Sequence, residues 1–472
     1  MIDTNRFVDM VPRDVFYICR TLRMGGWRAW IVGGCTRDMI IGRSVNDWDI
    51  ATDARPVDVI STFRRVIQTG VRHGTVTVLL NGTGYEVTTL RGDGTYSDGR
   101  HPDEVVFVDN LVLDLARRDF TINAIAFDPL DRVITDPFGG CSDLDAKLIR
   151  AVGVPRERYR EDGLRLMRAA RFASMLQFDL ENVTAVSIAE CADRLACVSS
   201  ERIRDELFKL LVGRDASRGL RIMQKGRMLE YVLPEAIASI GCTQCRYHAY
   251  DVWEHTLHAV DACRSDLVLR LTLLLHDLGK PVSRRWRDTD GTGGGDYTFH
   301  GHEVDGAEIA DRVGERLRFC GELRKRVVHL VRHHMLSCES NWTHRAVRRW
   351  VQRVGKENVI DLLEIARADA VGTGVDVVGR LRLLDELSER LRLLDVGSMA
   401  LTVGDLVIGG DDLMSVLGLQ RGRVVGKLLK HLLELVVDDP EMNERERLLR
   451  AARRYLEVEQ SVLTDESKNV SD

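Results

Sequence analysis

The apolar pattern changes once along this chain, near residue 145, and the change restricts the folds it can form. Before that point, short runs rich in β-branched residues alternate with turns, as in the strand-like segment 30–34. After it, helical periodicity continues to the C-terminus, broken by glycine and proline turns. The 472 residues are too many for one ordinary domain. The sequence therefore predicts the α+β class, with a mixed-sheet head followed by an all-helical body.

Composition restricts the setting in which the protein works. Hydrophobic residues make up 44% and charged residues 29%, as in soluble globular proteins. No apolar run approaches the roughly 20 residues of a membrane helix, and the N-terminus lacks a signal-peptide pattern. We expect a cytoplasmic protein without a membrane partner, whose 10 scattered cysteines stay reduced. With a net charge of −5, it must bind any nucleic acid through local basic surfaces, such as 147–171.

Two aspartates, Asp47 and Asp49, flank a tryptophan shortly after the glycine pair Gly33-Gly34. Carboxylates two residues apart on a strand point to the same side. A glycine turn nearby can admit phosphates, so Mg²⁺ with a nucleoside triphosphate suits this segment. Taken alone, such a pair of acids is more often a turn or a solvated strand edge. The metal interpretation therefore depends on further groups along the chain.

A third carboxylate, Glu86, lies on the second strand of a predicted hairpin. The β-rich runs 75–80 and 85–90 flank a glycine-bearing turn. If the strand of Glu86 pairs beside the strand of Asp47 and Asp49, three acids converge. They could then hold two Mg²⁺ ions, an arrangement that suits in-line nucleotidyl transfer.

Basic groups follow the hairpin. Arg117 and Arg118 precede Asp119, and arginine beside a carboxylate suits phosphate contact, although this segment alone would be a helix-capping cluster. Further along, Asp162 and Arg165 stand three residues apart on a predicted helix, so their side chains are neighbours.

The pair Asp162 and Arg165 has two interpretations. It could be an intrahelical ion pair of little energetic value. It could instead select a base, because cytosine and adenine both present an amine donor beside a ring-nitrogen acceptor, whereas uracil and guanine present a carbonyl there. Arg168 turns away from Arg165 toward the place where phosphates could lie, and Arg171 turns further and could be structural.

Together these segments resemble the class II tRNA nucleotidyltransferase/poly(A) polymerase family of bacteria. The matching segments, in the family's order, are 32–38, 47–49, 117–124, 161–172 and 201–207. The resemblance implies a polymerase β-like nucleotidyltransferase head in which Asp47 and Asp49 bind Mg²⁺. It also implies that the nucleotide is bound by Gly34, Arg37, Arg118, Asp162, Arg165, Arg168 and Arg171, with Asp162 and Arg165 selecting the base.

A second set of groups lies downstream. His255, His276, Asp277 and Asp369 resemble the four core positions of the HD domain of metal-dependent phosphohydrolases. A neutral imidazole and a carboxylate can share a divalent metal, so this set is a possible second metal site. The implied side activity is a 2′,3′-cyclic phosphodiesterase or phosphatase acting on RNA ends. The alternative is a helical scaffold that kept its shape without activity.

The resemblance implies a function and a domain order. We expect a CCA-adding tRNA nucleotidyltransferase that takes CTP and ATP as substrates and tRNA as partner. The full-length segment 91–103, expected to be a flexible loop before a strand at 105–108, favours a capacity to add the terminal A. The expected domains are a head at 1–145, a helical neck at 146–230, an HD domain at 231–380, a tRNA-binding helical tail at 381–456 and a flexible end at 457–472.

Other functions stay open at this point. A poly(A) polymerase or an enzyme that adds only A would share the same head. An HD phosphohydrolase whose head only binds RNA, or a tRNA-binding scaffold, would use the same folds differently. The presence of both Asp47 and Asp49 argues against the phosphohydrolase whose head only binds RNA and against the scaffold.

Overall fold

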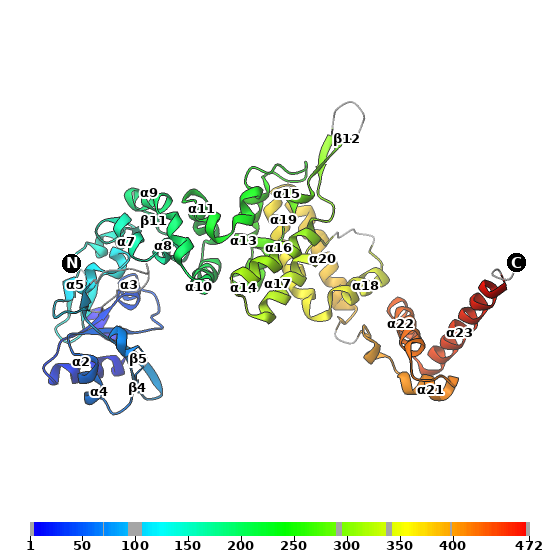
Figure 1. The fold of residues 1–472 in the computed structure, drawn as a ribbon, viewed down its shortest axis with the longest axis horizontal. Helices are drawn as coiled ribbons and strands as arrows, with labels where there is room; N and C mark the ends of the chain where they lie inside the picture. The colour runs from blue at the N-terminus through cyan, green and yellow to red at the C-terminus, as the bar shows by residue number, and fades with distance from the viewer. Residues whose placement is uncertain are drawn as a thin grey trace. The chain divides into compact units, whose positions relative to one another are not determined.

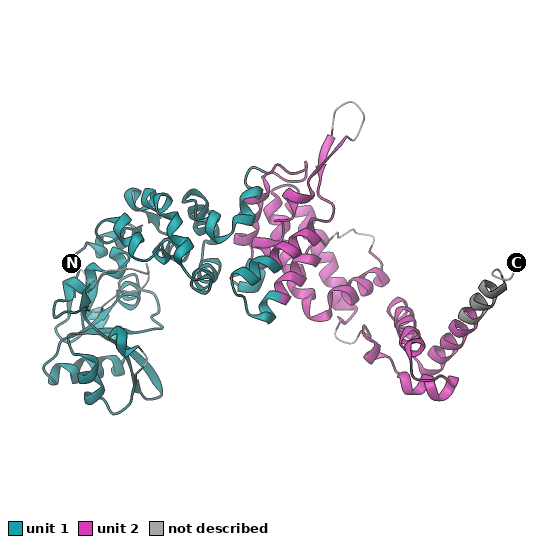
Figure 2. Cartoon of the chain, in the orientation of Figure 1, with its two compact units in different colours: residues 1–241, 264–271, 311–324 teal, residues 242–263, 272–310, 325–472 magenta. Residues whose placement is uncertain are grey.

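The computed structural model describes residues 4–68, 70–92, 106–288, 295–336, 342–396 and 399–468. Contacts between residues divide the chain into two compact units (Figure 2). Unit 1 comprises residues 1–241, 264–271 and 311–324, and unit 2 comprises residues 242–263, 272–310 and 325–472. The head and the neck lie in unit 1, whereas the four HD positions lie in unit 2.

Unit 1 begins with a seven-stranded mixed sheet in the order β3-β4-β5-β2-β1-β8-β9. Figure 1 labels its strands β4 and β5. Strands β2 and β5 pair in parallel, and the other neighbours pair antiparallel. The bounds are β1 Ala29–Val32, β2 Asp49–Thr52, β3 Val66–Ile67, β4 Thr75–Leu80, β5 Thr83–Thr89, β8 Ala126–Asp128 and β9 Val133–Thr135. The mixed-sheet head and its hairpin are thus confirmed.

The centre of this sheet is buried on both faces. On one face, α2 (Arg13–Met24) and α4 (Pro56–Thr62) enclose an apolar cluster that contains Ile31. On the other face, Trp30 and Val32 pack in a second cluster with α5 (Leu111–Ala116). Each fully buried aliphatic side chain contributes about 1.5–3 kcal/mol. Strand β1 is therefore held firmly, and it fixes the turn at its end.

Short elements complete the head. They are α1 (Thr4–Met10), α3 (Gly34–Ile40), η1 (Val71–His73), η2 (Thr121–Asn123), α6 (Gly140–Asp145) and the pair β6 (Arg91–Gly92) and β7 (Val106–Phe107). Strand β7 confirms the strand expected at 105–108. Most of the loop expected at 91–103 lies outside the described residues.

The neck packs around one central helix. Its elements are α7 (Pro155–Glu161), α8 (Leu164–Leu176), α9 (Asn182–Glu190), η3 (Ala192–Cys197), α10 (Ser200–Leu211), α11 (Ala216–Lys225), α12 (Leu229–Val232) and η4 (Pro234–Ser239). Helix α8 is buried along most of its length. A Cβ at Gly219 of α11 would lie 2.9 Å from the carbonyl of Ala170, so this close helix contact requires glycine. A short parallel pair, β10 (Leu148–Ile149) and β11 (Asp179–Leu180), interrupts the otherwise helical neck.

Unit 2 is mainly helical. Its elements include α13 (Val252–Ala262), α15 (Lys280–Ser283), α18 (His344–Val354), η5 (Lys356–Asn358), α19 (Val359–Thr373), α20 (Val377–Leu393), η7 (Val403–Asp405), α21 (Gly410–Leu417), α22 (Arg423–Asp438), η8 (Pro440–Met442) and α23 (Arg445–Lys468). Helices α14 (Leu267–Leu275), α16 (His302–Arg316) and α17 (Gly321–His333) belong to both units. One antiparallel hairpin, β12 (Arg285–Asp288) with β13 (Gly295–Thr298), interrupts this part.

Helix α23 is described as far as Lys468, within the segment expected to be flexible from residue 457. Residues 469–472 lie outside the described part of the chain. Among the described helices, none is both long enough and apolar enough to cross a membrane.

Candidate active site

The turn between β1 and α3 forms the centre of the first site. Gly33 has a φ of 78°, in the left-handed region that favours glycine. A Cβ at this position would lie 2.9 Å from Arg118 Nη1 and 3.6 Å from Asp49 Oδ2. The backbone therefore passes between a guanidinium and a carboxylate, and its positive φ at this position favours glycine.

The parallel pairing of β2 with β5 brings two of the predicted acids together. Asp49 lies directly opposite Glu86 in the register. Burial raises the pKa of Asp49 above its usual value, Glu86 and Asp47 raise it further, and Arg118 opposes them. The neighbouring carboxylates of Asp49 and Glu86 repel each other when both are charged, which favours a bound cation. Their oxygen atoms suit a hard divalent cation.

Asp47 lies close to these acids, but not on their strand. Strand β2 begins at Asp49, and Asp47 is exposed in the irregular segment before it. The prediction that both aspartates share one strand face is therefore wrong. The charge of Asp47 still raises the pKa of Asp49. The structure thus pairs Asp49 with Glu86, and the part of Asp47 as a third ligand stays a prediction.

A cavity of about 590 Å³ opens beside this acidic pair. Gly34, Asp49 and Glu86 line one part of it. Eight arginines also line it: Arg37, Arg91, Arg117, Arg118, Arg165, Arg168, Arg171 and Arg202. A cavity with carboxylates at one side and many guanidinium groups around it suits a metal-bound polyphosphate.

Buried acids fix the orientation of the arginines nearest the glycine turn. Asp114 on α5 contacts Arg117 at 2.7 Å and Arg118 at 3.3 Å. Burial alone would raise the pKa of Asp114, but the two arginines outweigh it and hold the pKa below its usual value. Arg37 donates to Asn123 Oδ1 at 2.8 Å. Each guanidinium is thus positioned before any ligand arrives.

The predicted neighbours Asp162 and Arg165 do not contact each other through their side chains. Asp162 lies between α7 and α8, where its Oδ1 accepts from the Leu164 N–H and its Oδ2 accepts from Arg202 at 2.7 Å. Arg165 pairs instead with Glu161 at 2.6 Å. The interpretation of Asp162 and Arg165 as an intrahelical ion pair is therefore wrong, because a helix break at Asp162 separates the two side chains. Both residues nevertheless line the cavity.

Arg168 and Arg171 are anchored by buried acids. Arg168 contacts Asp119 at 2.6 Å, and Arg171 contacts Glu206 at 2.8 Å. Burial would raise the pKa of Asp119, but Arg168 and Asn123 lower it to about 2. Both arginines, like Arg37, lie over the ring of Phe172, at 5.3, 4.2 and 5.2 Å from its centroid.

Several lining residues were not predicted as site residues. Arg91, Arg117, Asp119, Asn123, Phe172 and Arg202 line the same cavity. Arg202 was part of the family-like segment 201–207, which was the available signal. Arg117, Asp119, Asn123 and Phe172 likewise lie in the family-like segments 117–124 and 161–172, but those segments did not show that these side chains line the cavity. Arg91 lies outside the family-like segments.

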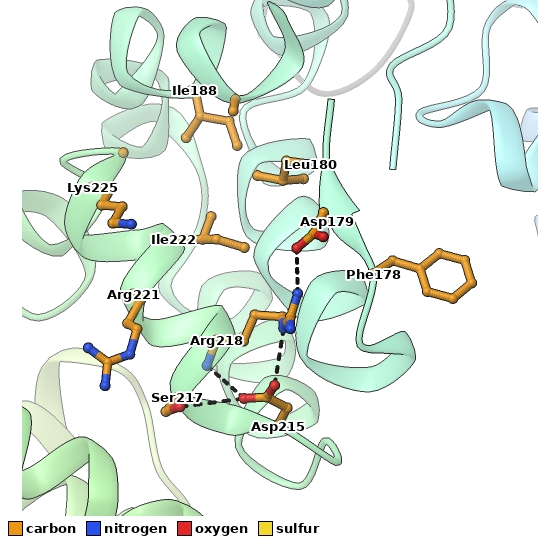
Figure 3. A pocket seen from close by; sticks show the side chains of 12 residues that line it. Phe178, Asp179, Leu180, Ile188, Asp215, Ser217, Arg218, Arg221, Ile222 and Lys225 are labelled. Carbon is orange, nitrogen blue, oxygen red and sulfur yellow. Dashed lines mark hydrogen bonds and ion pairs between the residues drawn. The ribbon is translucent and has the colours of Figure 1, made fainter. Parts of the chain in front are cut away.

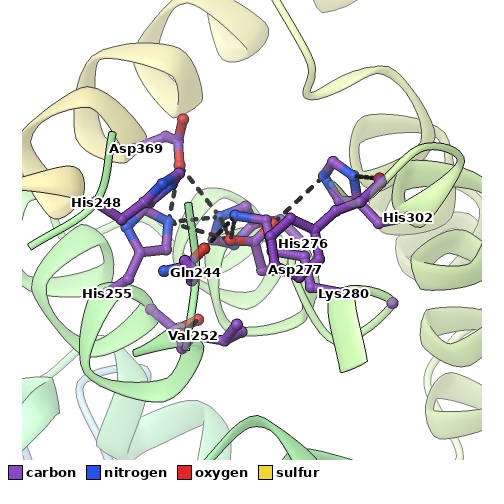
Figure 4. Close-up of polar contacts among 12 residues, drawn as sticks. Gln244, His248, Val252, His255, His276, Asp277, Lys280, His302 and Asp369 are labelled. Atoms are coloured by element: carbon purple, nitrogen blue, oxygen red, sulfur yellow. Dashed lines mark hydrogen bonds and ion pairs between the residues drawn. The ribbon is translucent and has the colours of Figure 1, made fainter. Parts of the chain in front are cut away.

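Unit 2 brings together all four predicted HD positions (Figure 4). His255 Nε2 lies 3.0 Å from Asp369 Oδ1, and His276 Nε2 lies 3.3 Å from the same oxygen. The two Nε2 atoms lie 3.3 Å apart. His276 Nδ1 lies 2.6 Å from the carbonyl of Leu273, which only accepts, so Nδ1 carries a proton. His276 Nε2 therefore faces the cluster as a potential ligand.

The electrostatics of this cluster also favour a cation. Burial would lower the pKa of His276, but Asp277 and Asp369 outweigh it and raise the pKa to about 10. Protons on the imidazoles thus take the place of a positive charge that the buried Asp277 and the partly exposed Asp369 favour. Mixed imidazole and carboxylate ligands suit a transition metal.

Two further histidines, His302 and His334, lie beside Asp277. His302 Nε2 and His334 Nε2 lie 3.5 and 3.8 Å from Asp277 Oδ1, and 3.3 Å from each other. Burial lowers the pKa of His334 to about 3, so its imidazole is neutral. These three groups form a second set of possible ligands that shares Asp277. The sequence showed both histidines, but only the fold places them beside Asp277.

Three family models match successive parts of the chain. They are the poly A polymerase head domain at residues 29–150, the probable RNA and SrmB-binding site of polymerase A at residues 177–240, and the HD domain at residues 246–373. Over these segments the chain is similar to the tRNA nucleotidyltransferase/poly(A) polymerase family. The family resemblance inferred from the motifs is confirmed, as is the α+β class with its HD domain.

Curated relatives in this family carry the name CCA-adding enzyme. The protein of Lactobacillus delbrueckii subsp. bulgaricus is 45% identical over 218 residues, which are 46% of this chain and 55% of the relative. That of Lactiplantibacillus plantarum is 49% identical over 203 residues, or 43% of this chain and 50% of the relative. The chain thus matches about half the length of these relatives.

A solved structure of the family extends the similarity further. The Bacillus stearothermophilus CCA-adding enzyme in complex with CTP superposes with a TM-score of 0.72 at 29% identity. It covers 95% of this chain and 98% of its own. The similarity therefore includes both units.

A second cavity of unit 1 lies within the segment matched by the RNA-binding model (Figure 3). It measures about 510 Å³ and is lined by residues of β11, α9 and α11. Arg218 is held there by Asp179 at 2.6 Å and by Asp215 at 3.1 Å. Of its described lining residues, none belongs to the predicted nucleotide site. The cavity beside Asp49 therefore remains the candidate active site of the head.

Proposed function

We propose that the protein adds C, C and A to the 3′ end of tRNA without a template, using CTP and ATP. The observation that carries this proposal is the register pairing of Asp49 with Glu86 beside an arginine-lined cavity. Support also comes from the curated relatives named CCA-adding enzyme and from the 29% identical enzyme crystallised with CTP. Since tRNA is the proposed substrate, we expect a cytoplasmic location.

The acids and the glycine turn would perform the transfer. Asp47, Asp49 and Glu86 offer the oxygen ligands that Mg²⁺ prefers. When bound, Mg²⁺ supplies Lewis-acid activation and neutralises phosphate charge. The 3′ hydroxyl oxygen attacks the α-phosphorus of the nucleotide, the new phosphodiester bond forms, and pyrophosphate leaves.

The surrounding groups would bind the nucleotide. Gly34, Arg37 and Arg118 border the glycine turn and would contact the triphosphate, with Arg168 and Arg171 further along the same wall. Asp162 would accept from the exocyclic amine of cytosine or adenine, and Arg165 would donate to the adjacent ring nitrogen. Arg202 would hold the Asp162 carboxylate in place. UTP and GTP present a carbonyl to Asp162 and would be rejected.

The domain roles follow from the same proposal. The head at 1–145 would perform the transfer, and the neck at 146–230 would select the base and bind RNA. The tail at 381–456 would hold tRNA, next to the HD domain at 231–380. The flexibility of residues 457–472 stays a prediction.

A nucleotide-addition assay tests the function. The purified protein is incubated with tRNA lacking its CCA end and with each labelled nucleotide in turn. CTP alone should extend the RNA and stop, and ATP should then add one residue. Extension with ATP alone and without limit would instead identify a poly(A) polymerase. Addition of A only to tRNA that already ends in CC would identify an A-adding enzyme.

A second candidate function belongs to unit 2. The convergence of His255, His276, Asp277 and Asp369 favours a metal-dependent phosphohydrolase that acts on RNA ends. The test uses RNA ending in a 2′,3′-cyclic phosphate, with added Mn²⁺, Ni²⁺ or Mg²⁺. A phosphodiesterase would add water across one P–O bond and leave a 2′- or 3′-monophosphate on the RNA, and a phosphatase would then release that phosphate. If none of these ions binds and no hydrolysis occurs, the HD unit is a scaffold.

A further inference from the structure

The hairpin β12–β13 carries a large aromatic ring in solvent. Trp286 on β12 lies directly opposite Tyr297 on β13, and their ring centroids are 5.0 Å apart at 74°. Trp286 is 55% exposed, although burying such a ring normally contributes strongly to folding. Two-stranded hairpins are marginal in isolation, so the Trp–Tyr pair also supports the hairpin itself. That support does not require so much of the indole to face water.

The aromatic pair is fixed in place before any ligand arrives. A Cβ at Gly295 would lie 2.7 Å from the indole, so glycine allows Trp286 to lie against the neighbouring strand. The Arg284 guanidinium lies 3.7 Å from the centroid of Tyr297 and also donates to Thr243 Oγ1. The Arg284 guanidinium therefore contacts the Tyr297 ring, which in turn contacts the Trp286 indole. Flat rings and a guanidinium in a fixed arrangement suit the stacking of nucleobases.

The charge of the hairpin suits a polyanion. Arg285 and Arg287 flank Trp286 along β12, and Asp288 ends the strand, so β12 carries one net positive charge on exposed residues. The carboxylate of Asp296 on β13 accepts from the Arg246 backbone at 3.1 Å and from its guanidinium at 3.2 Å. Its negative charge is therefore balanced within the protein. Arginines interleaved with aromatic residues are typical of surfaces that bind single-stranded nucleic acid.

The base of the hairpin is joined to the HD cluster. Phe299, which follows β13, accepts from His302 Nδ1 through its carbonyl at 2.7 Å. The Phe299 ring also lies 5.8 Å from Lys280 Nζ, which contacts Asp277 at 2.6 Å. A chain bound along the hairpin would therefore lead toward the candidate metal ligands.

We propose that the β12–β13 hairpin binds single-stranded RNA, with bases stacked on Trp286 and Tyr297 and phosphates paired with Arg285 and Arg287. It presents the RNA end to the HD cluster, and this second part rests on the proposed phosphohydrolase function. The stacking of bases does not depend on hydrolysis. Duplex RNA, whose bases are already stacked, is not the partner, and neither is an acidic peptide.

Photo-crosslinking of the full-length protein tests the contact at the residue level. A short single-stranded RNA with 4-thiouridine near its 3′ end is irradiated with the protein, and the adducts are located by mass spectrometry. Adducts should form on Trp286 or Tyr297, and excess duplex RNA or polyglutamate should not suppress them. Adducts confined to unit 1, or suppressed equally by polyglutamate, would overturn the proposal.

Substitution separates stacking from charge and from folding. Trp286→Ala should lower the crosslink yield at the hairpin by at least about fivefold, and Trp286→Phe should retain most of it. Tyr17→Ala is the matched control, because Tyr17 is 53% exposed and lies in unit 1. Unchanged yield in Trp286→Ala would contradict the proposal, provided that its melting temperature matches that of the control.

Kinetics then distinguish the two proposals. If the HD unit hydrolyses RNA ending in a 2′,3′-cyclic phosphate, Trp286→Ala should raise KM about fivefold or more and leave kcat nearly unchanged. Hydrolysis of a small chromogenic phosphodiester, which is too short to reach the hairpin, should not change. Absence of all hydrolysis in the unaltered protein would refute the phosphohydrolase, while crosslinks at the hairpin would still support RNA binding.

Discussion

Asp49 and Glu86 face each other across the parallel strands β2 and β5, in a cavity that eight arginines also line. Burial and Glu86 raise the pKa of Asp49. In the head without a bound metal, the carboxylates of Asp49 and Glu86 repel each other, and a bound divalent cation would stabilise them.

Removal of an acid should abolish nucleotide addition. Asp47→Ala or Asp49→Asn should lower incorporation on the order of a hundred- to a thousandfold or more, because the ligands for Mg²⁺ are lost. Binding of tRNA should stay largely intact, since these acids do not contact the body of the RNA in the proposed mechanism. Single-turnover incorporation and a gel-shift assay measure the two effects.

Asp131→Asn is the control for these variants. Asp131 is in the same unit and exposed, and it pairs with Arg23 away from the cavity. Incorporation that persists in Asp47→Ala or Asp49→Asn, or that falls equally in the control, would refute the metal role.

The raised pKa of Asp49 has a consequence for stability. In the pH range between the ordinary carboxyl pKa near 3.8 and the raised pKa, the folded state holds more protons than the unfolded state. Stability therefore falls as the pH rises through this range. Asp49→Asn should raise the melting temperature at pH 7 without metal, and the gain should vanish at pH 3. A lower melting temperature in Asp49→Asn at pH 7 would contradict this assignment.

The same measurement with Mg²⁺ tests the cation directly. Mg²⁺ should raise the melting temperature of the unaltered protein, because it binds the folded state. The rise should be smaller in Asp49→Asn. Equal shifts in both proteins would place the bound cation elsewhere.

The buried pair Asp119 and Arg168 should contribute to stability across neutral pH. The pKa of Asp119 is lowered to about 2, so its contribution is present above pH 3.8 and is lost as the pH falls toward 2. Asp119→Ala leaves the Arg168 guanidinium without this partner. We expect a loss of about 2–3 kcal/mol in urea unfolding at pH 7, below the value for a fully buried pair because Arg168 is one-third exposed. A loss that is as large at pH 2 as at pH 7 would exclude the ion pair as its cause.

Base selection should depend on the Asp162 carboxylate and its neighbours. Arg165→Ala should relax the preference for CTP and ATP over UTP and GTP. Arg202→Ala should have a weaker effect in the same direction, because it frees the Asp162 side chain. Incorporation of each nucleotide is compared as kcat/KM. Unchanged selectivity in Arg165→Ala would count against its role in reading the base.

The HD cluster should bind divalent metal independently of the head. His276→Ala should reduce bound Ni²⁺ or Mn²⁺, measured by elemental analysis, and should leave nucleotide incorporation within about twofold. His334→Ala should cause a smaller loss, because it removes one ligand of the second set. His344→Ala is the control, since His344 is exposed at the start of α18. Metal content that is unchanged in His276→Ala would refute the site.

Local sequence patterns predicted much of the fold. The β-rich runs 75–80 and 85–90 predicted the hairpin of β4 and β5, and apolar runs with glycine turns predicted the mixed-sheet head. These features depend on neighbours a few residues apart, whose side chains share a face by the geometry of the strand or helix. The helix break at Asp162 was missed, because the pattern around it continues on both sides.

The amino-acid sequence alone determined the kinds of groups available: acids beside a glycine turn, arginines on later helices, and histidines downstream, of which His276 precedes Asp277 directly. Their partnerships were decided by the tertiary structure. The pairing of β2 with β5 placed Glu86 opposite Asp49, and α10 brought Arg202 to Asp162 from 40 residues away. Packing of α13 against α19 brought His255 to Asp369. Such contacts form only when the apolar faces of distant elements are buried together, so no local pattern contains them.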